Sequence, residues 1–298
     1  MSDQPNAVED VRHLFQNIFA GEDSEGKSKT KPIFVSFDIA HGSKKGFSAI
    51  GVSVLDTRCF TGSTLHEFKN HGHSLFWTHT YNFQYGSPGV KRTQKRALFD
   101  GDAQKVSARD RTRLLEHIFF YPMDEDVTPC CQSQSFRPFR ASGAPRSPSR
   151  VGDGRSIIVV GHAINSDLRS LSRAGFSIAQ VAPILAVIDT QKVARELYWK
   201  DDRSKNVSLK DLCTLMGFHP TKLHSCGNDA AYTLIALLSL ASRIVGKEQE
   251  GAAARDTLEE LVQITLGLAR TAKQKFKAMR RDEQDVKDWM EYLDGKNV

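Results

Sequence analysis

The feature that most constrains the fold is a run of four β-branched residues, Ile157–Val160. A strand with apolar side chains on both faces is typical of a sheet that is covered on both sides. A second apolar strand is predicted at Ile33–Ile39, directly after Pro32. Because a sheet covered on both sides needs a layer of helices on each face, we expect an α/β fold.

The order of the predicted elements narrows the fold further. Strands at Ile33–Ile39, Phe47–Leu55 and Leu75–Phe83 are joined by polar connections and predict an antiparallel meander with the first strand central. Helices and strands then alternate along the chain, and they are predicted at Ser107–Phe120, Ile157–Val160, Asn165–Ala174, Val187–Ile188, Thr190–Trp199, Ser208–Met216 and Asn228–Val245. This order is that of a ribonuclease H-like mixed β-sheet, an antiparallel meander plus parallel strands flanked by helices.

We expect three regions along the chain. Residues 1–31 are predicted to form an amphipathic helix and a linker, and the apolar face of this helix either docks onto the domain, which we favour, or binds a partner protein. Residues 32–245 are the predicted ribonuclease H-like domain, interrupted at 122–156 by a Pro-, Ser- and Arg-rich stretch that is typical of a disordered insertion. Residues 246–298 are predicted to form a C-terminal helical extension with a basic second half.

The composition limits the classes of protein. A net charge of +6 permits a polyanionic partner without requiring one. The five cysteines have no CxxC spacing, which argues against a zinc ribbon or a disulfide framework and for reduced thiols. No apolar run reaches the roughly 18 residues of a membrane span, and Met1–Asp10 lacks a signal-peptide pattern. We therefore expect a cytoplasmic or nuclear protein with no membrane partner.

Three short stretches place carboxylates where predicted strands end or helices begin. Asp38 ends a central strand, Asp167 begins a helix just after a buried strand, and Asp229 lies in the first turn of the last long helix. Each of the two helix-start acids, taken alone, also fits a residue that complements the helix dipole. Together, three hard oxygen ligands suit a pair of Mg²⁺ or Mn²⁺ ions, so we predict that Asp38, Asp167 and Asp229 bind metal.

These stretches resemble the DEDDh branch of 3′→5′ exonucleases, in which the first stretch reads Asp-x-Glu and the third His-x4-Asp. The resemblance covers roughly Lys31–Val245. It implies that His224, five residues before Asp229, is the general base, and that the substrate is single-stranded RNA or DNA. Within the superfamily the chain looks most like a fungal branch that includes a supporter of a DEAD-box RNA helicase and an exonuclease of RNA silencing. The resemblance therefore also implies a helicase or silencing-complex partner, and a possible homodimer.

One residue departs from the family pattern, because Ala40 occupies the position of the Glu. The loss of one negative ligand is expected to lower turnover about 10²–10⁴-fold. Neighbouring His41 is a poor substitute, since alternation along a strand points it to the opposite face. Two histories fit, a natural loss or a deliberate Glu-to-Ala change.

Candidate substrate contacts lie close to these acids. They are Ile39, Ala40, His162 and Asn165. A purely structural role is an alternative for His162, and Asn165 either contacts phosphate or caps its helix. At the level of the whole protein, the alternatives to an impaired exonuclease are a nucleic-acid-binding module without chemistry and a protein–protein adaptor.

Overall fold

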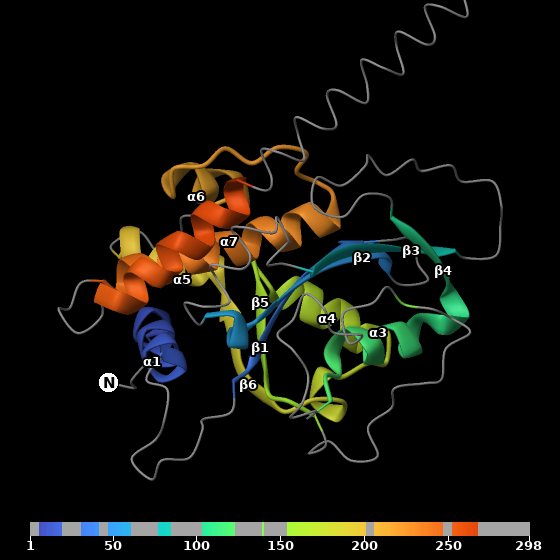
Figure 1. The fold of residues 1–298 in the computed structure, drawn as a ribbon. Coiled ribbons are helices and arrows are strands. Elements are labelled where there is room, and N and C mark those ends of the chain that lie inside the picture. The colour runs from blue at the N-terminus through green and yellow to red at the C-terminus, as the bar shows by residue number, and fades with distance from the viewer. Residues whose placement is uncertain are drawn as a thin grey trace, which may run out of the picture.

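The fold is that of a computed structural model, which describes residues 6–19, 31–41, 47–60, 77–84, 103–122, 139, 154–200, 206–246 and 252–267 (Figure 1). Its named strands are β1 (Ile33–His41), β2 (Phe47–Asp56), β3 (Trp77–Gln84), β4 (Gln104–Ser107), β5 (Ile157–Gly161) and β6 (Ile184–Asp189). Its named α-helices are α1 (Ala7–Phe19), α3 (Arg111–Phe119), α4 (Asn165–Arg173), α5 (Thr190–Tyr198), α6 (Leu209–Leu215) and α7 (Cys226–Val245). Among the described residues, no helix is long and apolar enough to cross a membrane.

The described strands form one mixed sheet in the order β4-β3-β2-β1-β5-β6. β1 pairs antiparallel with β2 and parallel with β5, so it lies inside the sheet as predicted. β2 and β3 complete the antiparallel meander, and β6 continues the parallel half beside β5. The predicted α/β fold with a ribonuclease H-like mixed sheet is thereby confirmed.

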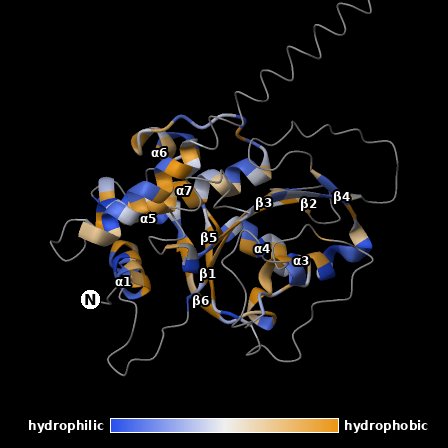
Figure 2. Ribbon diagram, in the orientation of Figure 1, coloured by the Kyte–Doolittle hydropathy of each residue, from blue (hydrophilic) through white to orange (hydrophobic). Residues whose placement is uncertain are grey.

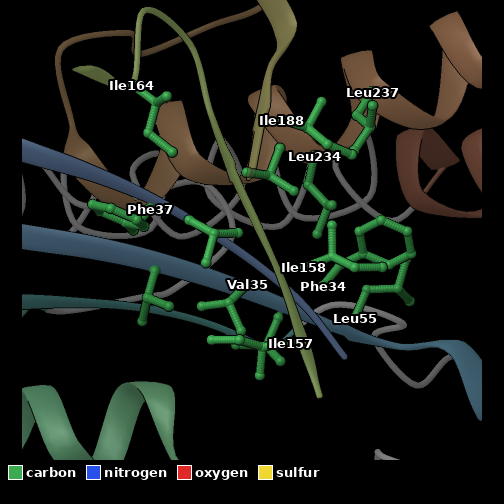
Figure 3. Close-up of a cluster of buried hydrophobic side chains, with 14 of the residues drawn as sticks. Phe34, Val35, Phe37, Leu55, Ile157, Ile158, Ile164, Ile188, Leu234 and Leu237 are labelled. Carbon is green, nitrogen blue, oxygen red and sulfur yellow. The ribbon is translucent and has the colours of Figure 1, made fainter. Parts of the chain in front are cut away.

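Helices cover both faces of the sheet, and β1 packs against both layers. The ring of Phe34 stacks on Phe15 of α1, with centroids 5.4 Å apart, whereas Phe37 meets Phe119 of α3 edge to face at 5.4 Å. In Figure 3, Phe34 lies in one buried cluster with Leu234 and Leu237 of α7, and Val35 and Phe37 of β1 are drawn in the same view. Apolar residues colour the inward sides of the helices in Figure 2. The alternation of large side chains along β1 therefore requires cover on both sides.

Helix α1 docks onto the domain, as we favoured. Its side chains Val8, Val11 and Phe15 are buried. The first helical N–H, that of Ala7, donates to the Glu196 carboxylate of α5 at 2.6 Å. The alternative of a free partner-binding helix does not fit a helix whose apolar face is already buried.

The described part of the C-terminal extension also packs on the domain. Residues 252–267 are helical, and Leu258, Leu261 and Val262 belong to the same buried cluster as the sheet. The basic half predicted at Arg270–Arg281 lies outside the described residues. The same holds for most of the insertion predicted at 122–156, of which the structure describes Pro122, Phe139 and 154–156.

The two ends of that insertion are tied to the sheet. Pro122 and Gly154 form an isolated bridge, and the N–H of Arg155 donates to the carbonyl of Tyr121 at 2.8 Å. The Arg155 guanidinium donates to both carboxylate oxygens of buried Asp56, at 2.6 and 2.8 Å, and to the carbonyl of Lys31. Arg58 donates to the same carboxylate. Burial alone would raise the pKa of Asp56, but the bonds from Arg155 and Arg58 hold it below its ordinary value.

Two strands differ from the sequence prediction. β4 was not predicted, because its four residues Gln104–Ser107 carry one buried apolar side chain, Val106, and no clear alternation. β6 is longer than Val187–Ile188 and runs from Ile184 to Asp189. It is the edge of the described sheet, and Leu185 and Val187 are about half exposed, at 54% and 49%.

Candidate active site

The N-terminus of α7 lies directly on the sheet beside Asp38, and a glycine makes this possible. Asp38 of β1 is the register partner of Gly51 on β2. A Cβ at Gly51 would overlap the backbone of Cys226 and Gly227, the first residues of α7. Only a residue without a side chain allows so close an approach. Gly51 thus brings the first turn of α7, which carries Asp229, next to the strand that carries Asp38.

Asp38 is the shared neighbour of the other acids. Burial raises the pKa of its carboxyl above the ordinary value, and three groups oppose this shift. The Cys226 thiol donates a hydrogen bond to it, and His41 and His224 act on it through charge. The same surroundings raise the pKa of the Cys226 thiol, which is buried and close to two carboxylates. Cys226 is therefore a neutral hydrogen-bond donor to Asp38.

Asp167 lies in the first turn of α4, which follows β5 after a tight turn. Ala163 in that turn has φ +57°. The Ile164 side chain packs against Gly161 so closely that a Cβ at Gly161 would come within 2.6 Å of it. The Asp167 side chain is 4% exposed and accepts the N–H of Ile39. Burial first, and then the charges of Asp38 and Asp189, raise its pKa to about 8.

Asp229 completes the group of acids. Its Oδ2 accepts the backbone N–H of His224 at 3.0 Å, while its buried Oδ1 has no hydrogen-bond partner. Burial and the charge of Asp38 raise the pKa of this carboxyl to about 7. The charge of Asp38 therefore raises the pKa of both Asp167 and Asp229, so three segments that are far apart in the sequence contribute to one anionic region.

His224 lies in the loop before α7 and is exposed. Its backbone has φ +67°, and that of nearby Lys222 has φ +56°. Such values are uncommon for residues with a side chain and concentrate at functional sites. The loop is held by the Asn228 amide, which donates to the carbonyl of Lys222 at 2.9 Å. The charge of His224 lowers the pKa of Asp38.

The donor set suits a divalent cation in its chemistry. Buried carboxylates that repel one another and a buried oxygen without a partner are both stabilised by an added positive charge. Within the described part of the chain, no three His, Cys, Asp or Glu side chains are already close enough to hold a metal ion. Ala40 supplies no oxygen from its side chain, and its carbonyl accepts a bond from Ser48 at 3.2 Å. Metal binding by Asp38, Asp167 and Asp229 stays a prediction.

The structure adds detail to the predicted substrate contacts. Both ring nitrogens of His162 are engaged, Nδ1 with Thr190 at 3.0 Å and Nε2 with the carbonyl of Val207 at 2.8 Å. Since a carbonyl only accepts, Nε2 carries the proton, and burial lowers the pKa of this ring. These contacts support the structural alternative for His162. Asn165 is exposed and makes no capping bond, and Ile39 uses its N–H for Asp167.

Sequence reasoning missed two neighbours of the acids and misplaced a third. Neither Cys226 nor Asp189 was connected with the acids from its position in the sequence. His41 was expected to point away from Asp38, but the strand register shifts between Ala40 and His41, so strict alternation fails there. The imidazole of His41 lies 3.3 Å from the Ser170 hydroxyl of α4 and acts on Asp38.

The fold and these residues define a class, a ribonuclease H-like α/β domain with an acidic nuclease-like site. A family model described as DNA polymerase III subunit epsilon-like, C-terminal domain (DEDDh_C), matches residues 121–240. This segment holds Asp167, His224 and Asp229 but not Asp38. The match supports similarity to the DEDDh exonucleases, a family that generally uses divalent metals such as Mg²⁺. No curated protein matches the chain.

Proposed function

We propose that this protein is a 3′→5′ exonuclease-like phosphodiesterase that acts on single-stranded nucleic acid and is impaired by Ala40. The observation that carries the proposal is that Asp167 of α4 and Asp229 of α7 are both affected by the charge of Asp38 on β1. Carboxylates are rarely buried together without a cation or a proton to offset their charge. The family match over residues 121–240 supports the same class of chemistry.

In this proposal the three carboxylates would hold Mg²⁺ or Mn²⁺. A bound ion would supply the positive charge that lowers the pKa of a water and offsets the charge of the leaving oxygen. The orphaned Oδ1 of Asp229 offers one acceptor, while its Oδ2 keeps the loop of His224 in place. In this scheme His224, which is exposed and whose charge lowers the pKa of Asp38, would take a proton from the attacking water.

Ala40 explains why turnover is expected to be low. It follows Asp38 by two residues on β1, so both side chains belong to the same face of the strand. A Glu there would add a fourth carboxylate to the group. Its absence removes about 3–5 kcal/mol of transition-state stabilisation, which corresponds to about 10²–10⁴ in rate.

The test restores the missing carboxylate. Ala40→Glu is assayed for Mn²⁺-dependent shortening of 5′-labelled single-stranded RNA and DNA from their 3′ ends. We expect a gain of about 10²–10⁴ over the unchanged protein. The matched control adds Asp167→Asn to Ala40→Glu. If the two variants cut equally, the nuclease assignment is rejected, and the comparison of RNA with DNA identifies the substrate class.

Ala40 itself favours a second candidate, a binding module that holds RNA or supports a helicase or silencing complex without chemistry. This candidate predicts salt-dependent RNA binding in EDTA. Its candidate contacts, the arginines of the insertion and Arg270–Arg281, lie outside the described residues.

An adaptor role predicts a co-purifying protein that is lost when 268–298 are removed. That truncation keeps the helix at 252–267, which packs on the core. A homodimer and a cytoplasmic or nuclear location remain predictions.

A further inference from the structure

The turn between β5 and α4 is held in its conformation by a neighbouring strand. Ala163 adopts φ +57°, which costs a residue with a Cβ about 1–2 kcal/mol unless its surroundings enforce it. Its backbone N–H donates to Oδ1 of Asp189 at 2.9 Å. Asp189 ends β6, and its register partner is Gly161 at the end of β5. One carboxylate therefore fixes a turn that lies across the strand pair.

The same oxygen also fixes the start of a second helix. Oδ1 of Asp189 accepts the N–H of Gln191 at 3.0 Å and so caps α5. The adjacent Thr190 hydroxyl lies 3.2 Å from the carbonyl of Gly161 and 3.0 Å from His162 Nδ1, and its single proton serves one of these two acceptors at a time. Three consecutive residues of the turn thus contact two consecutive residues of the β6–α5 junction.

Asp167 depends on this turn for its place. Its N–H donates to the carbonyl of Ile164 at 3.0 Å, so it follows the turn within one turn of helix. Its carboxylate must reach the N–H of Ile39 on β1, two strands away from Asp189. If Ala163 relaxed to negative φ, the start of α4 would rotate and carry Asp167 away from β1.

We propose that Asp189 is a positioning residue for Asp167, through the acceptor oxygen that it gives to Ala163. This inference rests on the proposed function, because its consequence is metal binding by Asp167. The scheme uses only Oδ1 of Asp189, which serves two backbone donors, and assigns no metal to this carboxylate. The His162 ring, held by Thr190 and Val207, braces the same turn from the other side.

Two variants separate the acceptor from the charge. Asp189→Asn keeps a side-chain oxygen for both backbone N–H groups, whereas Asp189→Ala removes it. Ser208→Ala is the matched control, because it removes the cap of α6, an exposed oxygen that accepts the N–H of Asp211 at 3.1 Å, and leaves the β5–α4 turn intact. Mn²⁺ binding to the full chain is measured by calorimetry, and amide exchange of 163–168 is followed without metal.

We expect Asp189→Ala to weaken Mn²⁺ binding about tenfold or more, as loss of outer-shell partners generally does. It should also speed exchange at Ala163. Asp189→Asn and Ser208→Ala should bind like the unchanged protein. Unchanged Mn²⁺ binding in Asp189→Ala, or equal weakening in Asp189→Asn, overturns the inference.

A failure of the proposed function looks different. In that case the unchanged protein and Asp167→Asn both fail to bind Mn²⁺. Amide exchange then decides whether Asp189 holds the turn. Faster exchange over 163–168 in Asp189→Ala alone supports the positioning contact, and equal exchange in all variants overturns it.

Discussion

Asp167→Asn should make this protein more stable at alkaline pH, although it removes a proposed metal ligand. The reason is the buried carboxyl, whose pKa is raised from 3.8 to about 8, first by burial and then by Asp38. One pKa unit corresponds to about 1.4 kcal/mol, so the roughly four units set a ceiling of about 5–6 kcal/mol. Water penetration and relaxation lower this figure, and we expect about 2–4 kcal/mol.

The sign follows from proton linkage. Between about pH 4 and pH 8 the folded state keeps a proton on Asp167 that the unfolded state releases. The contribution of this carboxyl to stability is therefore largest below its unfolded pKa and is lost as pH rises through the folded value of about 8. An amide does not ionise in this range, so the folding stability of Asp167→Asn should not show this decrease with rising pH.

The assay is urea unfolding in EDTA at pH 5 and at pH 8.5. The unchanged protein should lose about 1–3 kcal/mol more than Asp167→Asn between these two conditions, because part of the total loss has already occurred at pH 5. Asp256→Asn, on the exposed side of the helix at 252–267, is the control and should follow the unchanged protein. Added Mn²⁺ at pH 8.5 should stabilise the unchanged protein and not Asp167→Asn. Parallel pH curves for the two proteins would refute the reasoning about a shared buried charge.

Three further predictions follow from the same structure. Gly51→Ala should lower the melting temperature and abolish Mn²⁺ binding, because its Cβ would overlap the start of α7. Gly267→Ala, with open space around it, is the control and should change neither quantity. Equal behaviour of the two variants in differential scanning fluorimetry and calorimetry would show that α7 does not need to approach the sheet so closely. Asp56→Ala should cost about 3–5 kcal/mol in urea unfolding, since it leaves Arg155 and Arg58 without their buried partner; a loss below 1 kcal/mol would contradict a buried network. His224→Gln in the Ala40→Glu background should reduce cleavage about 10²-fold or more while Mn²⁺ affinity stays the same, and unchanged cleavage would remove His224 from the mechanism.

Local patterns were enough to predict the frame of this fold. The run Ile157–Val160 lies in β5, where every residue is buried, as its apolar side chains predict. The alternation in Phe47–Leu55 located β2 correctly, but the strand is buried on both faces rather than one, since polar Ser53 is buried too. Ser208, the first residue of a predicted helix, caps α6 and accepts the N–H of Asp211. These features depend on residues only a few positions apart, so they can be predicted from local sequence patterns.

Features that depend on tertiary approach could not be predicted in this way. Gly51 reads as an ordinary strand glycine until α7 is placed on top of it. The shift in register at Ala40 and His41 has no sequence signal that we recognise, yet it sets the surroundings of Asp38. The bond from Asp189 to Ala163 joins residues 26 positions apart. Motif spacing located the acids, and it contained no information on what holds them.

The clasp that Arg155 makes with Asp56 and Lys31 also has an evolutionary consequence. Since Pro122 and Gly154 are bridged at the same place, the segment between them begins and ends at one fixed point of the domain. Within that segment Phe139 packs against the buried cluster, and its ring lies 5.8 Å from that of His117 on α3. Insertions between Pro122 and Gly154 that keep Phe139 therefore leave both ends of the segment where they are, which makes it a place to graft a tag or a new recognition element.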